Sequence, residues 1–299
     1  IDAYKKALSL KPNFVKAEAQ KLHQFAHICD WDNLKLSQNI ISELGICDDY
    51  IPPFSVLSFE DSPERHHLRS KLYAKLKYTQ IPLEIITPPK HKPKRLRIGY
   101  FSSDFYNHAT MYLMVKMFKI HNRENFEIYI FSYGNNKNDE MKKRVMSYVD
   151  VFRDVSEFSD KEIALISKQN KIDIAVDLKG YTRETRSGIF AYRAAPVQIN
   201  LLGYPGTMGA EFIDYIVADK ILIPYENIST YGDIINSLRT DNKYLEMRKT
   251  YDTISHNKKV YTRFSSSFYI AFDGLPKIIK PKEGSKLFEL RTYEGYSED

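Results

Sequence analysis

The chain has 299 residues, of which 43% are hydrophobic, and a formal net charge of +6. This length and composition allow two or three folded domains with an apolar core. The positive charge is spread among many carboxylates, so it does not indicate a nucleic-acid-binding surface. Only two cysteines occur, Cys29 and Cys47, which excludes a disulfide framework and favours a reducing compartment. No apolar run approaches the length of a membrane-spanning helix.

The first 94 residues have the apolar spacing of helices. Apolar residues at positions 1, 4, 7, 8 and 10, followed by Pro12, predict an amphipathic helix. Further helices are predicted over 13–29, 33–46 and 62–76, the last with Pro63 in its first turn. Trp31, the only tryptophan, is expected to be a packing anchor. Four prolines between 82 and 93 and the basic run 90–97 predict an exposed linker.

From residue 95 the pattern changes to short apolar runs that alternate with helical stretches. Strands are predicted over 96–101, 126–132, 149–154, 172–178, 197–202 and 214–217. Helices are predicted between most of them, over 111–121, 139–148, 160–169 and 184–193. Such alternation is typical of βαβ units with right-handed crossovers, so the predicted fold class is α/β, with one Rossmann-like domain around a parallel sheet.

A polar turn follows the first predicted strand and contains Asp104, Asn107, His108 and Thr110. Open α/β sheets bind their ligands at the carboxyl ends of the strands, so this turn is a candidate site. A histidine side chain can donate or accept a hydrogen bond, so His108 is the sharpest candidate in this turn. The alternative is a loop or capping histidine that is satisfied by backbone. Asp104 is expected to cap the turn rather than to act as an acid.

Two glycine-containing turns follow later strands. Gly180 and Tyr181 follow the run 172–178, and Gly203-Tyr204-Pro205-Gly206-Thr207 follows the run 197–202. Glycines let the backbone approach a ligand and present its N–H groups, although an ordinary tight turn would look the same. Asp177 is expected to be structural. The sequence shows neither a metal-ligand cluster nor a pair of carboxylates at glycosidase-like positions.

Three blocks carry a family resemblance: Tyr-Phe-Ser-Ser-Asp-Phe-Tyr-Asn-His-Ala-Thr (100–110), Asp-Leu-Lys-Gly-Tyr-Thr (177–182) and Ala-Pro-Val-Gln-Ile-Asn-Leu-Leu-Gly-Tyr-Pro-Gly-Thr (195–207). Their order and spacing resemble the O-linked N-acetylglucosamine transferase/SPINDLY family, glycosyltransferase family 41. The resemblance implies tetratricopeptide-like helices at 1–50, a helical linker at 51–94, and one half of a two-domain GT-B fold at 95–229.

The resemblance also implies the activity, which is metal-independent, inverting transfer of N-acetylglucosamine, or a related sugar, from UDP-GlcNAc to Ser or Thr of proteins. No cofactor is implied beyond this sugar nucleotide. His108 would be catalytic, and the substrate contacts would come from Asn107, Thr110, Gly180, Tyr181, Gly203, Tyr204, Pro205, Gly206 and Thr207. Protein acceptors would bind through the tetratricopeptide repeats, in the cytoplasm and without nucleic acid or membrane.

The last quarter has a different character. The runs 244–251 and 287–293 are near copies, and together with 267–276 they resemble incomplete pieces of the NIPSNAP family. An irregular α+β tail is therefore expected over 236–299. The lysine and helix start that hold the nucleotide in family 41 have no counterpart after 229, so we expect this chain alone to transfer little or no sugar. The alternative function is a non-catalytic tetratricopeptide adaptor or a fusion remnant.

Overall fold

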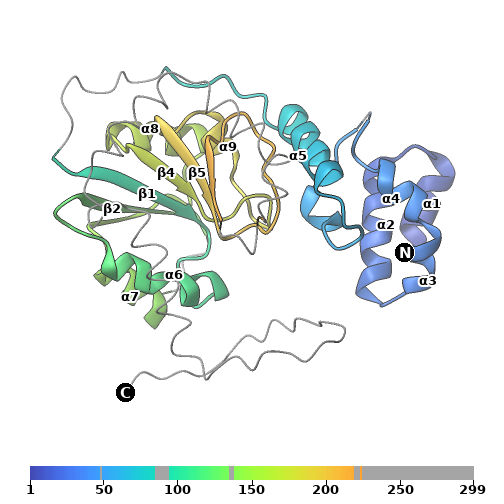
Figure 1. The fold of residues 1–299 in the computed structure, drawn as a ribbon, viewed down its shortest axis with the longest axis horizontal. Coiled ribbons are helices and arrows are strands. Elements are labelled where there is room, and N and C mark those ends of the chain that lie inside the picture. Colours follow the sequence, from blue (N-terminus) through green and yellow to red (C-terminus); the bar gives the residue numbers. More distant parts are fainter. Residues whose placement is uncertain (48, 85–93, 135–137, 219–222, 224–299) are drawn as a thin grey trace. The chain divides into compact units, whose positions relative to one another are not determined.

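A computed structural model describes residues 1–47, 49–84, 94–134, 138–218 and 223 (Figure 1). The chain divides into two units, Ile1–Ile235 and Asn236–Asp299. The second unit, with the predicted NIPSNAP-like tail and its two near copies, lies outside the described residues.

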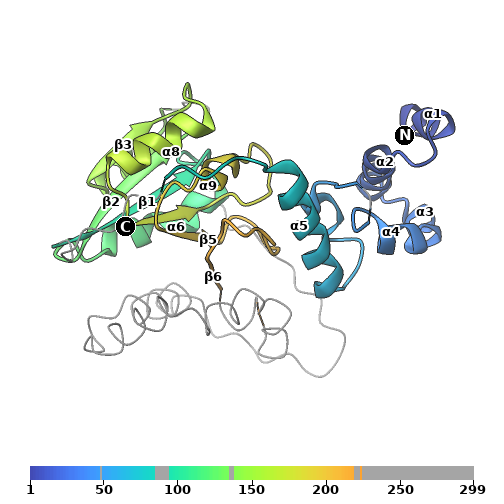
Figure 2. The ribbon, with the colours of Figure 1, turned by 90° about the horizontal axis from the view of Figure 1, so that it is seen from above.

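The amino-terminal part is helical, as predicted. It contains α1 (Asp2–Leu10), α2 (Val15–His27), α3 (Trp31–Leu36), α4 (Gln38–Glu43), the 3-10 turn η1 (Pro53–Val56) and α5 (Pro63–Lys77). These helices surround an apolar cluster that includes Leu22, Phe25 and Ile41. Figure 2 shows α1 to α4 gathered beside α5, at the end of this unit that lies away from the sheet.

Two expectations for this part are wrong. The predicted helix 33–46 is two short helices with a break at Ser37, whose hydroxyl donates to the Asn33 carbonyl. The first of them begins early because the Asp30 side chain accepts from the Asn33 amide and caps it. Trp31 therefore falls in the first turn of α3, with 62% of its surface exposed, and is not a packing anchor.

Helix α5 connects the helical part to the sheet. Arg69, fully buried on α5, pairs with Glu60 and donates from Nε to the Leu44 carbonyl over 2.6 Å. It thereby satisfies a carbonyl left free where α4 ends. On the same helix, Tyr73 and Ala74 belong to the apolar core of the sheet domain. Helix α5 thus contacts both the amino-terminal helices and the core of the sheet domain.

The remaining elements form one six-stranded parallel sheet, as the alternation predicted. The strands are β1 (Leu96–Ser102), β2 (Phe126–Ser132), β3 (Val151–Asp154), β4 (Ile174–Asp177), β5 (Val197–Leu201) and β6 (Tyr215–Val217). Their order is β3-β2-β1-β4-β5-β6, with every neighbouring pair parallel. This is the doubly wound arrangement, in which the strand order reverses between β1 and β4.

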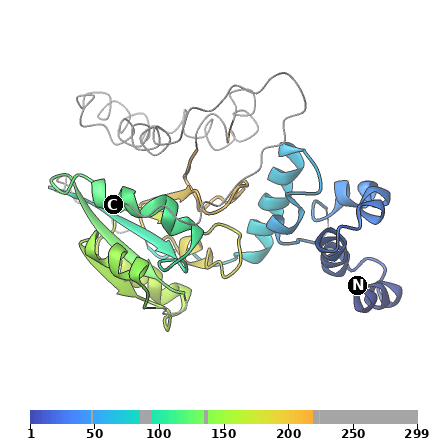
Figure 3. The ribbon, with the colours of Figure 1, turned by 90° about the horizontal axis from the view of Figure 1, so that it is seen from below.

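Helices cover both faces of the sheet (Figures 1 and 3). They are α6 (Ala109–Ile120), α7 (Glu140–Ser147), α8 (Asp160–Gln169) and α9 (Gly188–Ala191). Adjacent residues of β1 mark the two faces, since Tyr100 contacts Phe118 of α6 and Phe101 contacts Phe190 of α9. No helix among the described residues is long and apolar enough to cross a membrane.

The predicted helix 184–193 shrinks to the single turn of α9. Glu184 and Arg193, the two ends of the prediction, both have positive φ, at 63° and 61°. A residue in the left-handed region cannot continue a right-handed helix. The apolar spacing between them was therefore that of a buried turn and not of a longer helix.

Candidate active site at the carboxyl edge of the sheet

The strand order reverses between β1 and β4, so the loops that follow these two strands diverge at the switch point of the sheet. Ligands of doubly wound folds bind in the crevice outside the strand ends at this point. The β1 loop carries Asp104 and His108, and the β4 loop carries Lys179 and Gly180. Two of the three predicted motifs therefore meet where the fold favours a ligand.

A buried ion pair joins these two loops. Lys179 Nζ lies 2.9 Å from Asp104 Oδ2, and both side chains are almost completely buried. The other carboxylate oxygen of Asp104 accepts from the Ser103 hydroxyl over 2.7 Å. A buried pair of this kind contributes little net stability but fixes geometry, because removing one partner leaves a buried charge. Asp104 thus joins the two loops. The expectation that it caps the turn is wrong, because its carboxylate accepts from the Ser103 hydroxyl and Lys179 and not from an amide of the turn.

His108 caps the helix that follows the β1 loop. Its Nδ1 accepts from the Thr110 amide over 3.2 Å at the start of α6. Since an amide N–H can only donate, Nδ1 must present a lone pair, and the neutral ring carries its proton on Nε2. The side chain remains 38% exposed, and no hydrogen bond to Nε2 forms within the described part of the chain. In this state His108 offers an N–H donor to an incoming oxygen.

The carboxylate of Asp104 gives the ring a second possible state. Asp104 Oδ2 lies 3.7 Å from His108 Nδ1, which is beyond hydrogen-bond distance but close enough to receive an Nδ1–H after a small rotation. In that tautomer Nε2 would present a lone pair and could accept a proton. His108 can therefore donate from Nε2 while its Nδ1 accepts from the Thr110 amide, and it can act as a base only after that hydrogen bond is broken.

Asp177 organises the β4 loop from inside. Its Oδ1 accepts from the amides of Lys179 over 2.8 Å and Gly180 over 3.1 Å, and its Oδ2 faces Asn200 Nδ2 at 3.4 Å. Burial raises the pKa of Asp177 to about 6, against the opposing effect of these donors. Asp177 is structural, as predicted, and its environment is one that disfavours charge.

The glycine loop after β5 packs directly on the β4 loop. A Cβ on Gly203 would lie 1.6 Å from the Leu178 carbonyl oxygen, and one on Gly180 would lie 2.3 Å from Cβ of Tyr204. Gly180 also has φ +51°, where a side chain is strained. Glycine is therefore required at 180 and 203 for the two loops to contact each other, whether or not a ligand is bound.

The predicted contact residues differ in exposure. Asn107 and Pro205 are exposed, and His108 and Thr110 are half-buried. Tyr181, Tyr204 and Thr207 are buried; the Tyr181 hydroxyl donates to the Met208 carbonyl over 2.8 Å. Gly203 is half-buried, whereas Gly180 and Gly206 are buried. The sheet thus brings all three motifs to one edge, and among the predicted contact residues the polar side chains that reach solvent are those of the β1 loop.

Asn107 is held by hydrogen bonds on both its backbone and its side chain. Its backbone N–H donates to Asp139 Oδ2 over 2.6 Å, and its side-chain Oδ1 accepts from the Tyr112 hydroxyl over 2.7 Å. Asp139 is the N-cap of α7, so these bonds tie the β1 loop to the next helix. The loop that carries His108 is therefore anchored on both sides.

Sequence reasoning missed three buried polar residues at this edge. Lys179 lies within a motif that was noted only for its glycine and tyrosine, Asn200 lies in the apolar run 197–202, and Tyr133 directly follows the run 126–132. Burial, and then the charges of Asp177 and Asp104, raise the pKa of Tyr133. The signal that could have found them is a polar residue at the carboxyl end of a predicted strand, where open α/β sheets bind their ligands.

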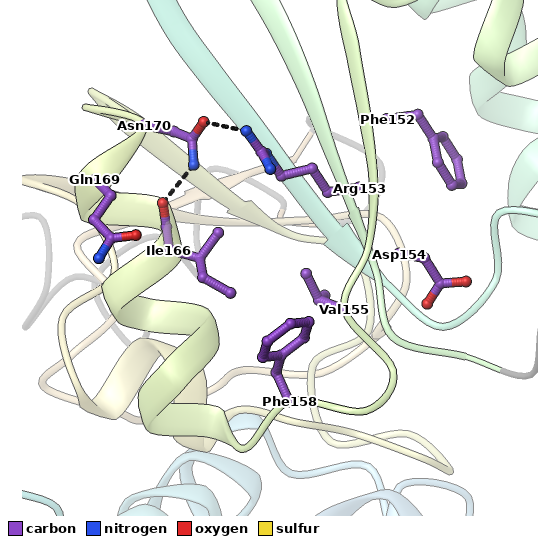
Figure 4. A pocket seen from close by; sticks show the side chains of 8 residues that line it. All are labelled: Phe152, Arg153, Asp154, Val155, Phe158, Ile166, Gln169 and Asn170. Atoms are coloured by element: carbon purple, nitrogen blue, oxygen red, sulfur yellow. Dashed lines mark hydrogen bonds between the residues drawn. The ribbon is translucent and has the colours of Figure 1, made fainter.

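A cavity of about 560 Å³ lies elsewhere, at the outer strand β3 (Figure 4). Val155, Phe158 and Ile166 provide apolar walls. At its rim, Arg153 donates to Asn170 Oδ1 over 2.9 Å. None of the predicted site residues lines this cavity, and it is not at the switch point. Among the described residues, no group of three or more His, Cys, Asp or Glu side chains could hold a metal ion.

The sheet order and the helices on both faces define a doubly wound, Rossmann-like domain. The model of glycosyl transferase family 41 matches residues 75–260, so the chain belongs to this family, as the three motifs predicted. The match begins in the predicted linker and ends beyond residue 229, where we expected the resemblance to stop.

Named relatives agree with this assignment. The probable UDP-N-acetylglucosamine–peptide N-acetylglucosaminyltransferase SEC of Arabidopsis thaliana is 45% identical over 140 residues, which are 47% of this chain and 14% of that protein. The corresponding transferase of Caenorhabditis elegans is 33% identical over 215 residues, 66% of this chain and 18% of that protein. A mutant of the Thermobaculum terrenum O-GlcNAc transferase superposes with a TM-score of 0.52 at 26% identity, covering 77% of this chain and 38% of that structure. The chain thus matches less than a fifth of the length of these two curated relatives.

Proposed function

We propose that residues 95–218 form one wall of the active site of a protein O-glycosyltransferase. The reaction is transfer of N-acetylglucosamine from UDP-GlcNAc to a serine or threonine hydroxyl. The relatives in Arabidopsis thaliana and Caenorhabditis elegans are named for this activity. The observation that carries the proposal is a half-buried His108 at the switch point of a family 41 sheet, on a loop anchored by a buried ion pair.

The residues of this wall act mainly by positioning. As the acceptor oxygen attacks the anomeric carbon, the bond to the diphosphate breaks, the anomeric configuration inverts, and the hydroxyl gives up its proton. In the capped tautomer, His108 Nε2–H donates to a substrate oxygen and orients it. To accept the proton, His108 must first place its own proton on Nδ1, toward Asp104. Most of the acceleration comes from orientation and from stabilising the leaving diphosphate.

The remaining features of the proposal follow the family. The donor is a substrate, and neither a metal nor another cofactor takes part. The helices of residues 1–50 extend a tetratricopeptide array that contacts protein acceptors, and the protein acts in the cytoplasm, away from membranes and nucleic acid. Support comes from the neighbouring helices α1 and α2, which pack on each other and end at Leu10 and His27.

The polypeptide of residues 1–299 is expected to transfer little or no sugar by itself. The diphosphate must be met by fixed N–H groups and a cation before it can leave. In the described residues, the lysine at the switch point is already paired with Asp104.

The test is a chimera. Residues 95–218 replace the matching segment of the Thermobaculum terrenum O-GlcNAc transferase, and transfer of radiolabelled N-acetylglucosamine to a serine-containing peptide is measured. We expect the chimera to be active and the 299-residue chain to be inactive. His108→Ala and His108→Asn should both lower kcat/KM of the chimera by about a hundredfold or more.

The two variants separate the imidazole from the cap. Asparagine can still accept from the Thr110 amide, whereas alanine cannot and should cost about 1 kcal/mol of stability. A chimera in which His108→Asn retains full activity would refute the role of the imidazole. A folded, donor-binding chimera without transfer would instead favour the adaptor alternative, and rapid transfer by the 299-residue chain would contradict the need for a further domain.

A further inference from the structure

Two histidines of α2 form a pair that the proposed glycosyltransferase chemistry does not use. His23 and His27 are four residues apart on one helix, so their side chains lie one turn apart on the same face. Their Nε2 atoms are 3.0 Å apart. Among the eight histidines of the sequence, this is the only pair with the i, i+4 spacing.

The pair lies on the outer side of a helix whose inner side is fixed. Leu22 and Phe25 of α2 are buried in the apolar cluster of the helical part, whereas His23 is half-buried and His27 is exposed. Packing of the inner side holds the backbone that carries both imidazoles. A ligand at the two Nε2 atoms would therefore find the backbone already in place and would still face solvent.

The distance between the two nitrogens fits one metal ion. A histidine nitrogen lies about 2.0–2.1 Å from a bound divalent ion such as Zn²⁺. At that bond length, two nitrogens 3.0 Å apart subtend an angle of about 90° at the ion, while a tetrahedral angle requires about 3.4 Å. The observed spacing matches two adjacent positions of a square-planar or octahedral ion, and a tetrahedral ion needs only a few tenths of an ångström more.

A bound metal would take the place of a hydrogen bond between the two rings. In the metal-free protein one ring donates its Nε2 proton to the other. Metal binding replaces this hydrogen bond, and the donating ring moves its proton to Nδ1.

We propose that His23 and His27 form a chelating site for a divalent late-transition-metal ion, with water completing its coordination. Imidazole suits Ni²⁺, Cu²⁺ and Zn²⁺, and their affinities follow the usual order with Cu²⁺ highest. The bound ion bridges two turns of α2 and stabilises the helix. The site is distinct from the switch point and lies in the tetratricopeptide-like part of the chain.

The test is calorimetric titration of the chain, without an affinity tag and after treatment with a chelator, with Ni²⁺ as the probe. We expect binding of one equivalent that is weakened at least about tenfold by His23→Gln or by His27→Gln. His91→Gln removes a histidine that has no other histidine three or four positions away in the sequence, and it should leave the affinity unchanged. Cys29→Ser tests the exposed thiol two residues beyond His27 and should also have no effect.

His27 is exposed, so His27→Gln should preserve the fold, which far-UV circular dichroism checks. Absence of one-equivalent binding in the wild-type chain would overturn the proposal. So would equal affinity of the wild type and His27→Gln, or loss of binding in Cys29→Ser with both histidines present.

Discussion

The buried carboxyl of Asp177 should make the stability of the sheet domain depend on pH in the direction opposite to that of a salt-bridged aspartate. Burial raises its pKa to about 6, against an ordinary value of 3.8. Between these values the folded protein binds a proton that the unfolded chain does not. The stabilisation is thus fully present below 3.8 and is lost as the pH rises through about 6.

The size of the effect follows from the shift. The difference between a pKa of about 6 in the folded protein and 3.8 in the unfolded chain corresponds to about 3 kcal/mol of stability. Asp177→Asn removes the charge, and the carbonyl of the introduced amide can still accept from the amides of Lys179 and Gly180. Its NH2 can donate to Asn200 Oδ1, buried and without a partner among the described residues, once the Asn200 amide turns over.

We therefore expect Asp177→Asn to match the wild type near pH 4 and to exceed it by about 1–3 kcal/mol at pH 8. Urea unfolding at several pH values measures this, followed by circular dichroism because Trp31 lies in the amino-terminal helices and not in the sheet. The exposed Glu124→Gln is the matched control and should shift stability equally little at every pH. Parallel pH profiles for wild type and Asp177→Asn would refute the reasoning.

Two further substitutions test the packing of the switch point. Lys179→Met leaves Asp104 buried without its cation and should lower the free energy of unfolding by about 3–5 kcal/mol. Most of this loss should be recovered in the Lys179→Met/Asp104→Asn double variant. If the effects of the two substitutions simply add, the buried ion pair is contradicted. Gly203→Ala places a methyl group 1.6 Å from the Leu178 carbonyl oxygen and should cost about 3 kcal/mol or more in urea unfolding, whereas Pro205→Ala, at an exposed position, should be nearly neutral; equal stabilities for these two would contradict the close contact of the loops.

The period of the apolar residues was sufficient to predict the sheet. The strand 126–132 and the helix 160–169 have the predicted bounds, and every observed strand overlaps a predicted one. The reason is physical, since strands of a parallel sheet are buried on both faces and read as continuous apolar runs. Alternation with helices then leaves only a parallel, right-handed arrangement.

Local backbone conformation was harder to predict. The short α9 and the division of 33–46 into two helices depend on single residues, namely positive φ at Glu184 and Arg193 and the break at Ser37. An apolar pattern does not report these. The exposure of Trp31 shows the same limit, because a large apolar side chain does not by itself determine which face of a helix is buried.

For the site, sequence predicted which loops meet but not how their charges pair. Three motifs after three parallel strands had to reach one edge, and they do. The pairing of Asp104 with Lys179 joins residues 75 positions apart, and neither residue type indicates its partner. The tautomer of His108 likewise depends on the backbone geometry at the start of α6, which placed its Nδ1 on the Thr110 amide.

The ion pair of Asp104 and Lys179 determines what this wall of the site can contribute to catalysis. A lysine at the switch point of a sugar-nucleotide enzyme would be an obvious cation for the diphosphate. Here Lys179 is buried and its charge is offset by Asp104 at 2.9 Å, so drawing it toward a ligand would leave a buried carboxylate unpaired. Leaving that carboxylate buried and unpaired costs several kcal/mol, which exceeds the stabilisation gained from one exposed ion pair with a phosphate. The wall therefore orients oxygen atoms through His108 and backbone groups, and Lys179 is not the cation that stabilises the departing diphosphate in the proposed reaction.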